Sequence, residues 1–335
     1  MLRWIVCVLA AVVGAGFASG REIIRFFSRW GVMSWPLIVL CAVSAAAMAY
    51  RMMRQAGTLF QAGRASRLAS WILAAMYLCV AGGMAASAGE LAALTVPARH
   101  ARSLGLLCTL AGCAAMSGKP LNALRRMGYI LIPLLIAAWT MCLRLPRAVE
   151  VHVALPYAPI NYLLSPLLTL FYCAMNMTLC TGVMQNVAFQ CNRKQQKRLA
   201  AGIGVSLGLM LCLGNAAFLP HIGLLLSQPL PTVMLLRSFG KTGFYLSAAV
   251  LYLAVVTTLI AALTAVRGLL PVHGIAGSLV FAAAGAIACL GFSQIVAWAY
   301  PALGAMGILL MLPRKKREQA APADSPFPQE SRYNS

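Results

Sequence analysis

Residues 13–22 read Val-Gly-Ala-Gly-Phe-Ala-Ser-Gly-Arg-Glu and interrupt the first apolar run of the chain. Three of these ten residues are glycine, and the last four include a serine, an arginine and a glutamate. In lipid, an unpaired backbone polar group is so costly that a chain unwinds at membrane depth only beside protein, water or a ligand. Unwound helices of this kind mark binding sites in secondary transporters. The segment therefore predicts a broken membrane helix with a binding site at the break.

The composition indicates a membrane protein along nearly the whole chain. Of the 335 residues, 61% are hydrophobic and 10% are charged, and the mean hydropathy is +0.82, which does not suit a soluble domain with a polar surface. Apolar runs near the roughly 20 residues that cross a bilayer lie at about 4–29, 34–53, 68–88, 103–117, 127–143, 157–188, 199–218, 243–266, 275–290 and 292–312. We expect an all-α, polytopic transmembrane domain over residues 1–312 with ten spans.

The basic residues indicate topology rather than a nucleic-acid partner. The net charge is +21, but the basic residues lie in short loops between apolar runs instead of on one soluble face. With both termini in the cytoplasm, 18 of the 27 Lys and Arg lie inside, as the positive-inside rule favours. The other nine lie outside: Arg21, Arg25, Arg29, Arg99, Arg102, Arg144, Arg147, Arg237 and Lys241. The expected location is the cytoplasmic membrane.

The two ends of the chain have distinct compositions. Residues 313–335 begin with Pro-Arg-Lys-Lys-Arg and continue rich in Pro, Ala, Ser and Gln, which predicts a disordered cytoplasmic tail whose basic start contacts anionic lipid head groups. Residues 1–20 also resemble a cleaved signal peptide, with Arg3 before an apolar stretch. Its removal would leave nine spans and move the basic tail to the less basic side, so we expect a span there.

The ten spans divide into five and five in the loop Arg144–Pro156, which gives one repeat over about 1–145 and another over about 155–312. The first member of each half carries a central irregularity, at Gly14–Gly20 and at Tyr172–Asn176, and the fourth member of each half is short. Interruptions at corresponding positions of two halves are typical of inverted-repeat transporters.

The stretch Gly14–Glu22 resembles the GAGFASGxE signature that opens the YkvI-like membrane proteins. The resemblance runs nearly end to end, although Met175 stands where that family more often has a second aromatic residue. Further matching elements are Phe171-Tyr172 with Asn176, Pro229-Leu-Pro231-Thr-Val-Met234, Thr257-Thr258, and Gly291-Phe292-Ser293 through Tyr300-Pro301 with Gly304 and Gly307. That family is similar to the amino acid, polyamine and organocation transporters. The resemblance therefore implies a LeuT-like bundle, a 5+5 inverted repeat with alternating access.

The broken first span supplies the first candidate site. Gly14 and Gly16 tolerate backbone angles that other residues avoid, so amide N–H groups around Ala15, Gly16 and Phe17 become available at the start of a second half-helix. Such an N-terminus attracts a carboxylate, and Ser19 adds polarity. The alternative is close helix packing, because Gly16-x-x-x-Gly20 is also a contact motif in membranes.

Tyr172 and Asn176 are one turn apart on the sixth span and can project to the same face. A hydroxyl and an amide together suit a zwitterion or an amide as solute. We therefore expect both to bind substrate, with interhelical hydrogen bonding as the alternative.

The eighth span carries Ala254-Val-Val-Thr257-Thr258, in which a carbonyl precedes two hydroxyls by one turn. Oxygen ligands suit a hard cation, and the LeuT-like resemblance implies that these groups join carbonyls near Ala10 and Val13 to hold Na+. In the alternative, each threonine hydroxyl bonds to the carbonyl one turn back and does nothing else.

Two acidic residues lie near the membrane. Glu22 is a candidate to carry a coupling proton, to gate the site or to fix the second half-helix, since an intramembrane carboxylate is functional by default. Its alternative is an interfacial ion pair with Arg21 or Arg25. Glu90 is expected at the outer surface.

Together these patterns predict a symporter for an amino acid or similar small solute, with Na+ or H+ as the coupling ion and no other cofactor. A channel would line a path with repeated polar rings, which the spans do not show. An enzyme is not expected, because no catalytic triad, metal-ligand set or phosphate loop appears in the spans. A sensor or partner membrane protein of the same fold remains the alternative.

Overall fold

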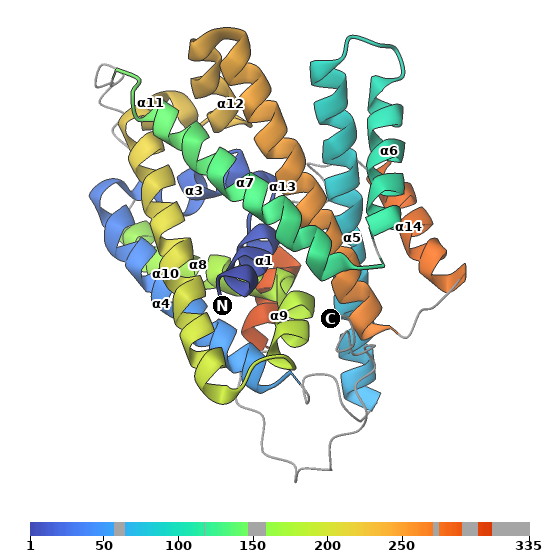
Figure 1. Cartoon of the computed structure of the whole chain (residues 1–335). Helices are drawn as coiled ribbons and strands as arrows, with labels where there is room; N and C mark the ends of the chain where they lie inside the picture. The colour runs from blue at the N-terminus through green and yellow to red at the C-terminus, as the bar shows by residue number, and fades with distance from the viewer. Residues whose placement is uncertain (57–63, 117, 147–158, 271–274, 290–300, 310–335) are drawn as a thin grey trace.

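The computed structural model describes residues 1–56, 64–116, 118–146, 159–270, 275–289 and 301–309. The described parts are helical and contain no strand. Figure 1 shows α1 and α9 in the middle of the bundle, with α4 and α10 on one side and α5, α6 and α14 on the other.

The first half of the chain forms the helices α1 to α7 and the 3-10 helix η1. In chain order they are α1 (Leu2–Val12), α2 (Ala15–Ala18), α3 (Arg21–Phe26), the 3-10 helix η1 (Ser28–Met33), α4 (Ser34–Arg54), α5 (Arg64–Thr95), α6 (Ala101–Met116) and α7 (Pro120–Cys142).

The second half of the chain begins with two helices that meet at a bend. Its elements are α8 (Pro159–Leu179), α9 (Thr181–Ala188), α10 (Arg193–Phe218), η2 (Leu219–His221), α11 (Ile222–Leu225), α12 (Pro231–Leu236), η3 (Arg237–Phe239), α13 (Gly240–Leu269) and α14 (Ile275–Ala288), and residues 301–309 are also helical.

Within the described ranges, five helical stretches are long and apolar enough to cross a membrane: Ser28–Arg54, Ser70–Thr95, Pro120–Cys142, Arg193–Leu225 and Pro231–Leu269. A sixth span results if Leu163–Leu179 and Thr181–Ala188, which meet at 61°, count together. Leu2–Val12, Ala101–Met116 and Leu279–Ala288 are apolar but shorter. The prediction of an all-helical, multi-pass membrane protein is confirmed at this level, and the count of ten spans stays a prediction.

Small residues let the central helix α1 approach its neighbours closely. Residues 6–12 of α1 are all buried. A Cβ atom on Gly128 of α7 would lie 2.8 Å from Val6 Cγ1 and 2.9 Å from Ala10 Cβ. Small residues permit such backbone approach between helices in membranes. The N-terminal helix is therefore a central part of the bundle.

The structure confirms the predicted interruption of the first span and corrects the position of the second. The first run is divided at Val13–Gly14 and again at Gly20, which has a left-handed φ of 81°. The expected irregularity at Tyr172–Asn176 is wrong, because α8 is continuous through Leu179 and the chain bends at Cys180. The Asn176 side chain donates to the Tyr172 carbonyl at 3.1 Å, a bond that a continuous helix accommodates.

Candidate functional site

The first break frees backbone groups in the centre of the bundle. Gly14 is extended, with φ −86° and ψ −179°, and its amide donates to the Val12 carbonyl at 2.8 Å. In a continuous helix this amide would bond to Ala10, so the Ala10 carbonyl loses its helical partner. Ala15, Gly16 and Phe17 are the first residues of α2. Their amides therefore have no carbonyl one turn earlier in the helix to which they could donate. The break therefore offers both donors and acceptors.

Thr258 of α13 lies directly against this break. A Cβ atom on Gly14 would be 3.1 Å from Thr258 Oγ1, so the missing side chain permits the approach. Thr258 Oγ1 is buried and has no hydrogen-bond partner among the described residues. By contrast, Thr257 Oγ1 donates to the Ala254 carbonyl at 3.0 Å. The alternative of a bond one turn back holds for Thr257 but not for Thr258.

The oxygen atoms near the break suit a hard cation. Ala10, Val13 and Ala254 are fully buried, and the Ala10 carbonyl and the Thr258 hydroxyl both lack protein partners within the described ranges. No group of three His, Cys, Asp or Glu side chains gathers in the described parts of the chain. Neutral oxygen donors of this kind are the ligands that Na+ would find here.

Glu22 of α3 points back into the bundle rather than to the surface. Its side chain is 9% exposed, and a Cβ atom on Gly16 would overlap Glu22 Oε1. Glu22 Oε2 is buried without a hydrogen-bond partner in the described structure. Among the described residues no ion pair joins Glu22 to Arg21 or Arg25, although Arg25 is close enough to interact electrostatically with the Glu22 carboxyl. The carboxylate therefore lies against the broken segment itself.

The other acidic residue behaves as expected for the surface. Glu90 pairs with Arg102 at 3.4 Å, and the two side chains are 45% and 60% exposed.

Tyr172 of α8 completes the buried polar group. Its hydroxyl lies beside the Glu22 carboxyl and interacts with it, although the two groups do not meet the geometry of a well-formed hydrogen bond in the described structure. The ring packs against Phe26 and Phe27 with centroid distances of 4.8 Å and 5.3 Å. The structure thus brings Tyr172 to Glu22, whereas the Asn176 side chain bonds to its own helix.

The short helix α12 covers the break from one side. The Thr232 amide donates to the Ser19 carbonyl at 2.9 Å, and Thr232 Oγ1 donates to the Ala18 carbonyl at 2.9 Å. Trp139 Nε1 donates to the same hydroxyl at 3.4 Å, and the Trp139 ring packs against Phe17 at 5.6 Å. We call this group of hydrogen-bonded residues the α12 lid: it consists of Thr232 and its partners Ala18, Ser19 and Trp139.

Ser19 contributes to the local geometry rather than facing an open space. Its hydroxyl donates to the Gly16 carbonyl at 3.0 Å, which holds the short turn of α2 together. Sequence reasoning missed Thr232 and Trp139. The only signal near them is the pair of prolines at 229 and 231, which marks the start of α12 but not a contact with α2.

No family model matches this chain, and no curated protein resembles it significantly. Its similarity to the YkvI-like membrane proteins rests on the residue patterns given above and stays a prediction.

Proposed function

We propose that this protein is a secondary active transporter, an ion-coupled symporter of an amino acid or similar small organic solute in the cytoplasmic membrane. One observation carries the proposal: Glu22 Oε2, Tyr172 Oη and Thr258 Oγ1 are buried without hydrogen-bond partners in the described structure around one broken span. The large majority of buried polar side-chain atoms in proteins are paired. Glu22 and Tyr172 interact with each other, so the hydroxyl of Thr258 is the clearest indication here of a ligand or ion that the protein itself does not supply.

A LeuT-like 5+5 repeat is the arrangement that we propose for the spans. Support comes from matching lengths: α4 and α10 have 21 and 26 residues, and α5 and α13 have 32 and 30. The fourth members of the two halves, α6 and α14, are short at 16 and 14 residues. Corresponding members also pack together, α4 on α10 and α5 on α13.

The α12 lid and the break support a transport cycle of the following kind. With the lid closed, the Ala18 and Ser19 carbonyls are bonded to Thr232, so solute enters from that side only after these bonds open. A solute carboxylate would then bind the amides of Ala15, Gly16 and Phe17.

The Glu22 carboxyl occupies the position at Gly16 where the solute carboxylate would bind. Because its Oε1 lies on Gly16, a solute carboxylate would meet a second negative charge in a buried site. Like charges at close range disfavour joint ionisation, so binding is coupled to protonation or displacement of Glu22. The Thr258 hydroxyl and the Ala10 carbonyl offer the second coupling route, through Na+.

The test is uptake of pooled labelled amino acids into proteoliposomes under an imposed Na+ gradient, an imposed H+ gradient or neither. Na+-driven uptake that Thr258→Ala abolishes and Thr257→Ala preserves would assign coupling to Na+. H+-driven uptake that Glu22→Gln abolishes and Glu90→Gln preserves would assign it to the proton.

The two control substitutions are matched in chemistry. Thr257 is adjacent to Thr258 but its hydroxyl is satisfied within α13, and Glu90 is paired at the surface. If neither gradient increased the uptake of any amino acid pool, the result would contradict the transporter proposal. A sensor or partner membrane protein would then be the remaining function.

A further inference from the structure

Three sulfur-bearing side chains from two helices meet inside the bundle. The Cys173 thiol of α8 donates to Met48 Sδ of α4 at 3.6 Å and lies 3.8 Å from the Cys41 carbonyl of the same helix. The Cys41 thiol in turn interacts with the Cys173 thiol. Cys41 and Met48 are two turns apart, on one face of α4. We call Cys41, Met48 and Cys173 the sulfur cluster.

Two other buried thiols show the more usual arrangement. Cys7 Sγ donates to the Leu121 carbonyl at 3.6 Å, and Cys180 Sγ donates to the Val8 carbonyl at 3.7 Å. A carbonyl oxygen is a better acceptor than a thioether. A cysteine that packs as a small hydrophobe needs no second sulfur beside it. The convergence of three sulfurs therefore distinguishes the sulfur cluster from the thiols near α1.

Thiolate and thioether ligands select soft metal ions, chiefly Cu(I) and Zn²⁺. A structural Zn²⁺ site takes four ligands, usually cysteine and histidine. In the described parts of the chain, no group of three His, Cys, Asp or Glu side chains gathers to provide them. Cu(I) carries a single charge, which one thiolate neutralises, and a neutral unit suits an interior in which a net charge is costly. The ligand set thus favours Cu(I).

The spacing of the sulfurs fits a shared metal ion. Metal–sulfur bonds of about 2.3 Å to two sulfurs 3.6 Å apart enclose an angle of about 100°. A trigonal site with an angle of roughly 120° needs these sulfurs to separate by about 0.4 Å. The three rotatable bonds of the Met48 side chain permit a movement of this size. Cys41 and Cys173 are fully buried and Met48 is half-buried, so an incoming ion meets Met48 first.

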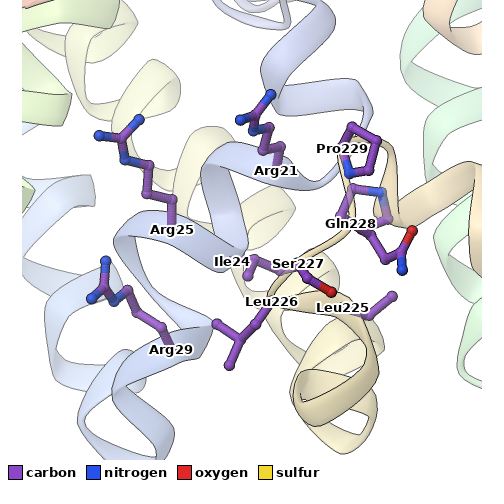
Figure 2. Close-up of a pocket in the computed structure, with 10 residues that line it drawn as sticks. Arg21, Ile24, Arg25, Arg29, Leu225, Leu226, Ser227, Gln228 and Pro229 are labelled. Atoms are coloured by element: carbon purple, nitrogen blue, oxygen red, sulfur yellow. The ribbon is translucent and has the colours of Figure 1, made fainter. Parts of the chain in front are cut away.

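The pocket beside α3 and η1 offers no comparable ligands. It has a volume of about 460 Å³ and is lined by Arg21, Arg25 and Arg29 and by residues 225–229, among others. Figure 2 shows the three guanidinium groups extending in different directions, with the 225–229 loop beside the segment that bears them. A guanidinium group has donors and no acceptor, so these side chains cannot bind a metal ion.

We infer that the sulfur cluster is a binding site for one Cu(I) ion. The ion takes the place of the hydrogen between Cys173 Sγ and Met48 Sδ. The S–H bond breaks, a Cu–S bond forms to the resulting thiolate, and the proton is released to water. The Met48 thioether and the Cys41 thiol supply the other two sulfurs. A bound ion would join α4 to α8 beside Tyr172, whose hydroxyl interacts with Glu22.

The experiment measures Cu(I) binding to the purified full-length protein in detergent, without oxygen and with ascorbate, by competition with a coloured Cu(I) chelator. Every protein carries Cys108→Ser and Cys289→Ser, which remove two exposed thiols. We expect one equivalent of Cu(I) to bind tightly. Cys41→Ser/Cys173→Ser should lose about a hundredfold or more in affinity, because a hydroxyl is a poor ligand for a soft ion.

The control Cys7→Ser/Cys180→Ser removes two buried thiols whose acceptors are carbonyls, bonds that a serine can also make. It should keep the affinity within about twofold, because neither thiol belongs to the sulfur cluster. Met48→Leu keeps the volume of the side chain and should lose about tenfold, with its thioether. Equal melting temperatures of the metal-free variants would exclude a folding defect.

X-ray absorption of the Cu(I)-loaded protein identifies the ligand atoms, and sulfur neighbours alone would support the inference. Affinity unchanged in Cys41→Ser/Cys173→Ser and in Met48→Leu would overturn it, as would an equal loss in the Cys7→Ser/Cys180→Ser control. Nitrogen or oxygen neighbours around the bound ion would also overturn it. The measurement needs no flux, so its outcome is independent of the transporter proposal.

Discussion

The two helix breaks of this molecule differ in how the buried polar groups around them are satisfied. At the second break, the Thr178 carbonyl accepts from Thr181 Oγ1 at 2.7 Å and from the Tyr77 hydroxyl of α5. The Cys180 amide donates to Met177 at 3.1 Å, and its carbonyl accepts from Met184 at 2.8 Å. The protein itself supplies the partners at this bend.

At the first break, orphaned groups remain. Thr258 Oγ1 and Glu22 Oε2 lie beside Gly14 and Gly16 without partners in the described structure. Both breaks interrupt a helix, yet within the described ranges the unpaired buried polar atoms lie beside the first break and not beside the second. A broken span is therefore a weak indicator of a binding site by itself, and the hydrogen-bond partners around it decide. Changes at the first break should impair function, and changes at the second should impair stability.

The largest expected effect comes from Gly16→Val. Its Cβ would overlap the Glu22 carboxylate, so α2 and Glu22 must shift apart. A displacement of about 1 Å at a binding site can cost roughly a hundredfold in rate, and we expect a loss of that size in initial uptake by proteoliposomes. Gly112→Val is the control, because a Cβ there meets no atom within 4 Å and the residue is exposed. Uptake equal in the two variants would contradict the assignment of the first break.

The next effect concerns the α12 lid, through Thr232→Val. The substitution removes the bond to the Ala18 carbonyl and the acceptor of Trp139 Nε1. Losing two hydrogen bonds worth roughly 0.5–1.5 kcal/mol each should raise the equilibrium for local opening by about fivefold to about a hundredfold. Hydrogen–deuterium exchange of the peptide that covers residues 15–20 measures this opening. Thr140→Val is the control, since its exposed hydroxyl bonds only within α7. Unchanged exchange in Thr232→Val would mean that the lid is not held by this contact.

The sequence predicts the first break and not the second, for a physical reason. Gly20 adopts a left-handed φ that glycine permits, and the missing side chain of Gly14 admits Thr258, so both glycines mark the first break locally. The bend at Cys180 has no glycine or proline at its centre, and depends on the Tyr77 hydroxyl, 101 residues away in the chain. Such a tertiary contact leaves no local pattern.

The residues of the candidate site differ in the same way, because some are recognisable from the sequence and others only from tertiary contacts. Glu22 is recognisable from sequence because a carboxylate in an apolar run is rare. Thr257 and Thr258 are equivalent as a sequence pattern, and only the rotation of α13 decides which one faces Gly14. Thr232 lies in the proline-led segment before α13, but nothing in that segment indicates a contact with α2, so its role in the lid required the structure.

A smaller effect, on stability alone, is expected from Tyr77→Phe at the second break. The Thr178 carbonyl loses one of its two side-chain donors but keeps Thr181. The expected cost is roughly 0.5–1.5 kcal/mol in the free energy of unfolding, seen as a lower melting temperature in detergent. Uptake at a temperature below the transition should stay within about twofold. A large loss of uptake at unchanged melting temperature would place the second break in the binding site as well.

The smallest effect is expected from Asn176→Ala, in the helix that lies between the two breaks. Asn176 lies in α8 between Tyr172, near the first break, and Cys180 at the second. Its amide donates to the Tyr172 carbonyl, a group already within a continuous helix. If this bond is its whole role, the change costs at most about 1 kcal/mol of stability and alters the KM of uptake by less than about twofold. If Asn176 instead binds the solute directly, the change should raise KM by about tenfold or more, since a polar group of the solute would be left unpaired.

Tyr172→Phe is the matched comparison, because it removes the buried hydroxyl beside Glu22. A larger KM effect in Asn176→Ala than in Tyr172→Phe would move the site from the first break toward the middle of α8.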